Sequence, residues 1–203
     1  MSVPTSQIEL QYTRKGHRFI AGVDEVGRGC LAGPVVGAAV ILDLNNIPDG
    51  INDSKKLSAK KREALVPLIK EACVAYAVGV GSVKEVDSIN ILNAAKLAMV
   101  RAIQKLEPKA DFLLVDGNQR LNSEIPQLTV IQGDSKSVSI GAASILAKVY
   151  RDLLMAKMDE KYPGYEFTKH KGYGSKVHRL AMQKLGLSPI HRKSFSWTPV
   201  QGA

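Results

Sequence analysis

The sequence predicts a single α/β domain in which a mixed five-stranded sheet is flanked by helices and followed by a helical C-terminal region. Short apolar segments come first, then alternate with helical segments, and finally give way to helical segments alone. The chain has 203 residues, which is enough for one substantial core and not clearly enough for two. We therefore expect one domain over residues 1–203, with an α/β core at about 18–160 and the helical region at about 161–203.

Five segments have the composition of strands. Each is short, rich in β-branched or other apolar residues, and bounded by glycine, proline or polar residues. They cover residues 18–24, 34–42, 73–82, 111–116 and 128–132. The FLLV run in the fourth segment indicates a strand that is buried on both faces.

Four segments have the periodicity of helices. Ser58 has the residue type of an N-cap for the first of them, which Pro67 weakens near its middle. In the second, small and apolar residues recur at helical spacing. The expected helices cover residues 59–72, 89–106, 139–161 and 175–185.

The composition favours a basic protein that meets a polyanion. The chain has 28 Lys and Arg against 19 Asp and Glu, a net charge of +9, and a pI near 9.5. Such an excess favours nucleic acid as a partner, although many soluble proteins are basic without binding one. Cys30 and Cys73 lie far apart and form no C-x-x-C pair, which argues against a disulfide framework or a zinc site. Since no segment resembles a signal peptide or a membrane span, we expect a soluble, cytoplasmic protein with no membrane partner.

Four acidic residues each end or follow an apolar run: Asp24, Glu25, Asp116 and Asp134. Asp24 and Asp116 would meet at one edge of the sheet if their strands are parallel neighbours. Converging carboxylates repel one another unless cations lie between them, and Mg²⁺ or Mn²⁺ prefers such oxygen ligands. Two such ions can promote displacement at a phosphodiester. The pattern therefore suggests a metal-dependent nuclease. The simpler alternative, that an Asp only forms a turn, is strongest for Asp116, which precedes Gly117.

A glycine-rich loop follows the first two acids. Gly27, Arg28 and Gly29 resemble the start of a dinucleotide-binding fingerprint, but that motif opens a helix. Here Pro34 and a β-branched run follow, and two carboxylates beside the loop would repel a pyrophosphate. We therefore interpret the glycines as positions where the backbone approaches a sugar-phosphate, with Arg28 as a planar donor to phosphate.

Several motifs in this order give the chain a clear resemblance to ribonuclease HII. They are DEVGRG, NDSKKLS, LLVDG, GDSKSVSIGAASILAKVYRD and YPGYEFTKHKGYGS. The resemblance covers residues 19–195 and implies a ribonuclease H-like fold. It also implies an Mg²⁺- or Mn²⁺-dependent endoribonuclease with a two-metal site that cuts the RNA strand of RNA–DNA hybrids. Such an enzyme nicks duplex DNA on the 5′ side of embedded ribonucleotides, leaving 3′-hydroxyl and 5′-phosphate ends, as ribonucleotide excision repair requires.

The resemblance assigns roles to individual positions. The four metal-binding, catalytic acids of the family fall on Asp24, Glu25, Asp116 and Asp134. Its loop that contacts the 2′-hydroxyl falls on Gly27, Arg28 and Gly29, and its junction-sensing tyrosine falls on Tyr173. Many relatives have Pro-Thr after this tyrosine, whereas this chain has Gly174 and Ser175. The sister family, ribonuclease HIII, usually carries Gly-Lys-Gly and an extra N-terminal domain, so Arg28 and the short N-terminus argue against it.

Other features leave alternatives open. Lys55 and Lys136 are candidate phosphate contacts, together with Lys56 and Lys148, and the four histidines are interpreted as structural or phosphate-facing. A non-catalytic nucleic-acid-binding module would fit the basicity, and a structure-selective nuclease of the same superfold would fit the acids. The tail SFSWTPVQGA lacks the paired aromatics of a sliding-clamp peptide, so we expect no clamp contact through it, and we expect a monomer.

Overall fold

The computed structural model describes residues 3–201 and contains the mixed five-stranded sheet that the sequence predicts. The strands lie in the order β3–β2–β1–β4–β5. Their bounds are β1 (Ile20–Val26), β2 (Val35–Leu42), β3 (Cys73–Gly81), β4 (Phe112–Asp116) and β5 (Gln127–Val130). The first three strands pair antiparallel, whereas β4 runs parallel to both β1 and β5.

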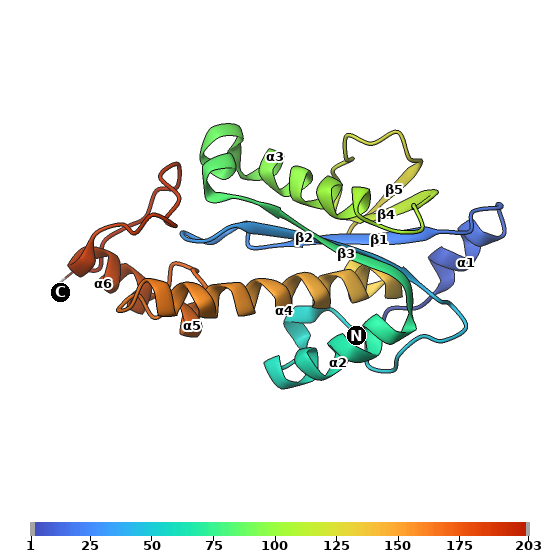
Figure 1. Ribbon diagram of the computed structural model, residues 1–203, viewed down its shortest axis with the longest axis horizontal. Coiled ribbons are helices and arrows are strands. Elements are labelled where there is room, and N and C mark those ends of the chain that lie inside the picture. Colours follow the sequence, from blue (N-terminus) through green and yellow to red (C-terminus); the bar gives the residue numbers. More distant parts are fainter. Residues whose placement is uncertain (1–2, 202–203) are drawn as a thin grey trace.

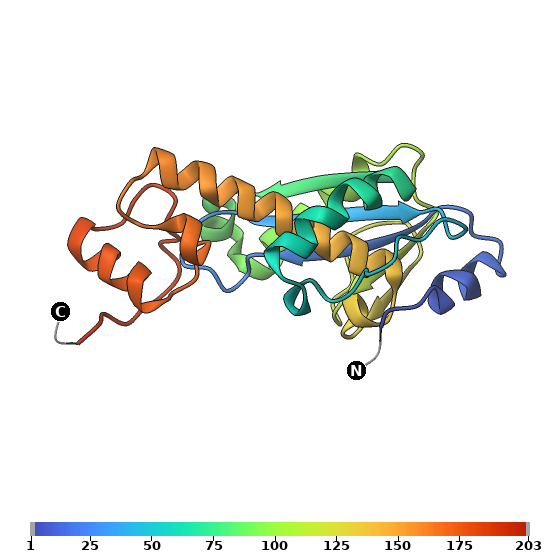
Figure 2. The same cartoon turned by 90° about the horizontal axis from the view of Figure 1, so that it is seen from below.

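Helices cover both faces of the sheet. The α-helices are α1 (Gln7–Thr13), α2 (Ala59–Ala72), α3 (Val83–Gln104), α4 (Val138–Lys161), α5 (Phe167–His170) and α6 (Lys176–Leu185), and the short 3₁₀ turns are η1 (Ser54–Lys56) and η2 (Gly133–Ser135). Figure 1 shows α3 on one face and α4 with α2 on the other. Figure 2 shows the C-terminal region gathered at the far end of α4, away from the N-terminal helix.

Alternate residues of each strand enter one of two core layers. Ala21 and Val23 of β1 pack toward α3, in a cluster with Met99 and Ala102. Gly22 faces α4 instead, and a Cβ there would lie 2.1 Å from the carbonyl carbon of Ser139. A glycine is therefore required at this position, because α4 begins directly against β1.

The element boundaries differ from the predictions in informative places. β1 does not end at Asp24, because its pairing with β2 continues to Val26. The predicted helix over residues 89–106 is the second part of α3, which runs from a kink at Asn90 (φ of 66°) to Gln104, and the Asn90 side chain accepts the Asn93 N–H at 3.0 Å. The first part of α3 was not predicted; it begins at Val83, where Ser82 and Glu85 form a capping box. The short helices α1 and α5 were not predicted.

Between residues 3 and 201, no helix has both the length and the apolar composition that a bilayer crossing requires.

Candidate active site

Asp24 and Asp116 lie side by side at the carboxyl ends of two parallel strands. The register pairs Val23 with Val115, so the next residue on each strand is one of these acids. Asp24 points to the α4 face, where Ser144 lies, and its carboxylate accepts the Glu25 N–H at 2.7 Å. The predicted meeting of these acids therefore follows from the sheet topology.

The electrostatic environment of Asp24 opposes its ionisation. Its side chain is buried, and burial raises its pKa well above the usual range. The nearby charges of Glu25 and Asp116 raise this pKa further. A site of this kind favours a cation that restores balance among the carboxylates.

Glu25 lies on the opposite face of β1 because side chains alternate along a strand. Its Oε1 accepts from the Arg28 guanidinium at 3.1 Å, and the Arg28 side chain is half exposed. Burial raises the pKa of Glu25, and Arg28 partly offsets that shift. This ion pair joins the glycine-rich loop to the acidic edge, by which we mean the edge of the sheet that carries Asp24, Glu25, Asp116 and Asp134.

Asp116 and Asp134 are connected through the backbone of η2. The Gly133 N–H donates to Asp116 Oδ1 at 2.7 Å, and Asp134 follows immediately. Asp134 is buried, and its pKa rises to about 6 because of burial and the charges of Asp53 and Asp116. Asp53 is thus a fifth acid at this edge, and the sequence analysis did not single it out. Its position in the NDSKKLS motif was the available signal.

The two candidate lysines occupy different positions around this edge. The ammonium of Lys55 lies 4.0 Å from Asp134 Oδ2, and its side chain is 84% exposed. Lys136 is exposed at the end of η2, two residues after Asp134. Both therefore border the acidic edge and face solvent, where a phosphate backbone could reach them.

The donor set fits a hard divalent cation, although each acid has a separate partner. Within residues 3–201, no group of three or more His, Cys, Asp or Glu side chains is already arranged to bind a metal ion. Asp24 accepts the Glu25 N–H, Glu25 accepts from Arg28, and Asp116 accepts the Gly133 N–H. All four predicted ligands nevertheless offer carboxylate oxygens at one edge of the sheet, and the pKa values of three of them are raised. A set of donors that consists only of oxygens and carries an excess of negative charge suits Mg²⁺ or Mn²⁺.

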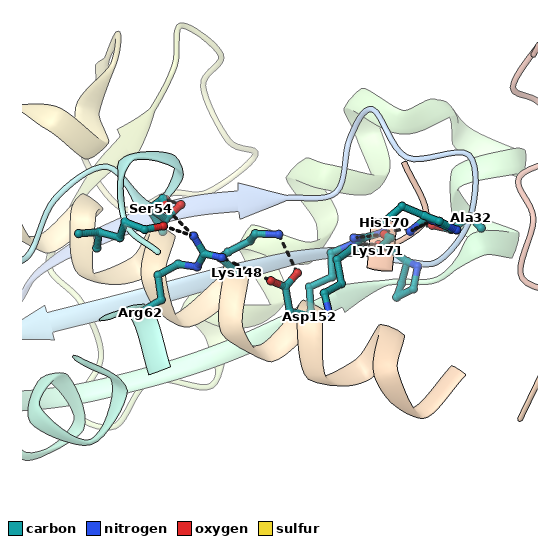
Figure 3. A network of polar contacts seen from close by, with 12 residues as sticks. Ala32, Ser54, Arg62, Lys148, Asp152, His170 and Lys171 are labelled. Atoms are coloured by element: carbon teal, nitrogen blue, oxygen red, sulfur yellow. Dashed lines mark hydrogen bonds and ion pairs between the residues drawn. The ribbon is translucent and has the colours of Figure 1, made fainter. Parts of the chain in front are cut away.

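A polar network supports the acids from the α4 side. The Ser144 hydroxyl, next to Asp24, shares a hydrogen bond with the Ser54 hydroxyl at 2.9 Å, and Arg62 donates to the Ser54 carbonyl at 2.8 Å. Arg62 approaches Asp152, which binds Lys148 at 2.7 Å. Figure 3 shows Ser54, Arg62, Asp152 and Lys148 in this network. Lys148 is thus paired within the protein.

The N-terminal helix contributes a buried acid that the sequence analysis missed. Glu9 is fully buried, and its Oε1 accepts from the Ser137 hydroxyl at 2.6 Å and the Ser139 N–H at 3.0 Å. Thr5 adds two backbone bonds, to Lys136 and Val138. Glu9 therefore fixes the start of α4, next to the turn that carries Asp134. Only its place in the fold identifies this role.

Tyr173 lies beside the glycine-rich loop, which is far away in the sequence. Its backbone pairs with Cys30, the residue directly after Gly29, and the Leu31 N–H donates to the Gly172 carbonyl at 2.8 Å. Tyr173 as a whole residue is 42% exposed. The structure therefore brings the two predicted recognition elements together at one end of the acidic edge.

Two buried histidines hold the Tyr173 backbone. His178 Nδ1 lies 2.9 Å from the Tyr173 carbonyl and its Nε2 lies 3.0 Å from His191 Nε2. His191 Nδ1 in turn accepts the Ser188 N–H at 2.8 Å. With His191 Nδ1 as the acceptor, this chain of bonds assigns one proton to each ring, so that both rings are neutral. Accordingly, burial lowers the pKa of His178 to about 4.

A cavity next to Glu25 and Asp116 extends the candidate site toward α3. Besides the acids it is lined by Arg28, Leu92 and Lys96. The kink at Asn90 precedes these α3 residues. Lys96 was not singled out from the sequence, because a lysine on an amphipathic helix is usually a solvated surface residue.

Comparisons with known proteins agree with this geometry. The family model described as "Ribonuclease HII" matches residues 21–198. A ribonuclease HII of Syntrophotalea carbinolica is 53% identical over 188 residues, which cover 92% of this chain and 90% of that protein.

Two solved archaeal structures share the fold. The ribonuclease H2 of Pyrococcus horikoshii is 29% identical with a TM-score of 0.72, covering 88% of this chain and 94% of that chain. The ribonuclease HII of Archaeoglobus fulgidus, solved as a complex with PCNA, is 25% identical with a TM-score of 0.75, covering 90% of this chain and 98% of that one. Since the family model matches most of the chain and the relatives match it almost end to end, this chain belongs to the ribonuclease HII family.

Proposed function

We propose that this endoribonuclease cuts the RNA strand of RNA–DNA hybrids and nicks duplex DNA on the 5′ side of embedded ribonucleotides. The products would carry 3′-hydroxyl and 5′-phosphate ends. One observation carries the proposal: the acidic edge and the loop that pairs with Tyr173 are adjacent, and the Arg28–Glu25 ion pair joins them. A substrate backbone that crosses the edge would therefore reach both elements at once.

Asp24, Glu25, Asp116 and Asp134 are the proposed ligands of Mg²⁺ or Mn²⁺. When bound, such ions supply Lewis-acid stabilisation to a phosphodiester, and two ions can stabilise both the attacking and the leaving oxygen. The protein contributes the charge and the positions of the ligands. The backbone N–H groups of Glu25 and Gly133 orient Asp24 and Asp116 through hydrogen bonds. Lys55, close to Asp134, is a proposed contact to a neighbouring phosphate, as is Lys136.

Recognition of the ribonucleotide is assigned to the loop and the tyrosine. A Cβ on Gly29 would have no heavy atom within 4 Å, so the backbone there is open to a sugar that carries a 2′-hydroxyl. The half-exposed Arg28 offers planar donors to phosphate. Tyr173 offers an exposed aromatic face for the following deoxyribose, a contact that tolerates any base.

One assay tests the proposal. Three duplexes are compared, one with a single embedded ribonucleotide, one of DNA alone and one long RNA–DNA hybrid, each with and without Mg²⁺ or Mn²⁺. We expect cation-dependent cleavage of the first and third only, with the cut 5′ to the ribonucleotide. Binding without cleavage under every condition would indicate a non-catalytic module. Cleavage of a four-way DNA junction in preference to the ribonucleotide duplex would indicate a structure-selective nuclease.

We also propose that residues 1–203 act as one domain, as a monomer in the cytoplasm. The single-domain proposal is supported by α4, which packs on β1 near Gly22 and supplies Arg151 and Met155 to the C-terminal region. Equilibrium unfolding followed at Trp197 and by far-UV circular dichroism should give coincident transitions.

A further inference from the structure

Two arginines are buried between the glycine-rich loop and the C-terminal region. Arg151 of α4 is fully buried, and Arg192, after α6, is 2% exposed. Within residues 3–201, neither forms an ion pair with a carboxylate. Instead, each guanidinium donates three hydrogen bonds to backbone carbonyls. This arrangement differs from the usual pairing of buried arginines with acids.

The carbonyls that Arg192 binds belong to the loop itself. Its three nitrogens donate to Gly27 at 2.6 Å, to Arg28 at 2.8 Å and to Gly33 at 3.0 Å. Its pKa falls to about 10 because burial penalises the charge. The loop that precedes Cys30 is therefore fixed on its buried side by Arg192, which follows Arg28 by 164 positions in the sequence.

The carbonyls that Arg151 binds connect the loop to Tyr173. The Arg151 guanidinium donates to Pro34 at 2.9 Å and Ala32 at 3.0 Å on one side, and to Lys171 at 2.8 Å on the other. Lys171 lies two residues before Tyr173. Figure 3 shows Ala32 and Lys171 together at this point of the network.

The glycines around these arginines reflect the same packing. Gly27 has φ of +96°, and a Cβ there would lie 2.2 Å from Arg151 Nε. A Cβ on Gly172 would lie 2.4 Å from the Ala32 carbonyl oxygen. Gly27 is therefore required by the packed arginine, whereas Gly29 is the open position of the loop. Gly27 thus packs against the protein interior, whereas Gly29 faces outward.

We propose that Arg151 and Arg192 are positioning residues that fix the spacing between the Gly27–Gly29 loop and Tyr173. By doing so they set the preference of the enzyme for a junction at which a deoxyribonucleotide follows a ribonucleotide. This inference rests on the proposed function, since it assumes that the loop and Tyr173 read adjacent sugars. Hydrogen bonds from a charged donor to several carbonyls define a geometry that apolar packing alone does not impose.

The test uses Arg192→Lys and Arg151→Lys, which keep the positive charge but lose the planar fork. The measured quantity is the ratio of kcat/KM on a single-ribonucleotide duplex to kcat/KM on a long hybrid. We expect each variant to lower this ratio by about 5- to 10-fold, the equivalent of one or two hydrogen bonds. Arg62→Lys is the matched control, because Arg62 also donates to carbonyls, at Ser54 and Leu57, but away from Tyr173. Its ratio should equal that of the wild type.

Equal losses on both substrates, together with a lower Tm, would overturn the proposal and leave the arginines a purely structural role. If a lysine variant does not fold, Arg192→Gln removes the buried charge while keeping amide donors, and the same fall in the ratio is expected. In a Tyr173→Ala background, Arg192→Lys should leave the ratio unchanged; a further fall would also contradict the proposal. Failure of the wild-type enzyme to cleave either substrate would instead refute the proposed function.

Discussion

The acidic edge and the recognition end, which consists of the Gly27–Gly29 loop and Tyr173, are each stabilised by a different kind of hydrogen bond. At the acidic edge, protein donors satisfy carboxylates, as when the Gly133 N–H binds Asp116. At the recognition end, guanidinium donors satisfy backbone carbonyls, as when Arg192 binds Gly27. The first arrangement places negative charge where cations can neutralise it. The second fixes the backbone itself, so that its outer surface has a defined shape.

If the proposed roles hold, this difference means that cleavage and recognition of the ribonucleotide depend on separate sets of supporting contacts. The acids depend on the register of β1 with β4 and on the start of α4. The loop and Tyr173 depend on Arg151, Arg192 and the pair His178–His191. Changes to the first set should therefore lower cleavage of every substrate, and changes to the second should alter substrate preference.

The largest expected effect comes from removing one charge at the acidic edge. Asp134→Asn keeps the shape of the side chain but loses the charge that is proposed to hold a cation. We expect cleavage of both substrates to fall by about 100-fold or more, with binding largely retained. Fluorescence anisotropy and single-turnover cleavage measure the two properties separately. Near-normal turnover at saturating Mg²⁺ would remove Asp134 from the site.

The next effect concerns the stability of the recognition end at low pH. The folded pKa of His178, about 4, lies below the unfolded value of 6.5, so the unfolded chain binds the proton first as the pH falls. Stability from this group is complete above pH 6.5 and is lost as the pH falls toward 4, by up to about 3 kcal/mol. Urea unfolding at several pH values measures it. His178→Asn, which cannot titrate, should show a shallower dependence, and an unchanged slope would contradict the neutral-ring assignment.

Loss of Tyr173 should alter substrate preference rather than abolish activity. Stacking of a base on an aromatic side chain is worth about 1–3 kcal/mol, and a contact of that size would change kcat/KM by about 5- to 150-fold. Tyr173→Ala should lose this factor on a single embedded ribonucleotide and much less on a long hybrid, where no deoxyribose follows the cut. Tyr173→Phe keeps the ring and serves as the control. Equal losses on both substrates would assign Tyr173 a general structural role.

Substitutions at Glu9 should affect the acidic edge indirectly, through the start of α4. Glu9→Ala leaves the Ser139 N–H and the Ser137 hydroxyl without their buried acceptor, which should lower the free energy of unfolding by about 1–3 kcal/mol. Because the turn that carries Asp134 loses its support, cleavage of both substrates should fall in the same proportion. Glu9→Gln retains an oxygen acceptor and should lie close to the wild type. A change confined to one substrate would contradict this role.

The smallest effect is expected at a surface lysine. Lys136→Ala should weaken binding to every nucleic acid alike and reduce the slope of log Kd against log salt concentration by about 1. Lys109→Ala is the control, because Lys109 precedes β4 and so lies at the end of that strand opposite Asp116. Identical slopes for the two variants would exclude a phosphate contact at Lys136.

The sequence predicted the acidic edge better than its surroundings because apolar strands followed by acids leave a local pattern. The pattern placed the first strand end at Asp24, but pairing with β2 extends β1 to Val26, a property of the partner strand. Tyr173 was identified only through the family resemblance, and nothing local put it beside Cys30. Arg151 sits in a helix where a charged residue normally indicates solvent. Its burial depends on carbonyls more than 100 residues away in the sequence.

The claim that the acidic edge and the recognition end depend on different stabilising contacts is tested most directly by one quantity, measured in two variants. The preference ratio, kcat/KM on a single-ribonucleotide duplex over kcat/KM on a long hybrid, is determined for Tyr173→Ala and Glu9→Ala under identical conditions. We expect Tyr173→Ala to lower the ratio by about 5-fold or more, whereas Glu9→Ala should lower both activities and leave the ratio at the wild-type value. The same ratio in both variants would show that the two regions act as a single unit.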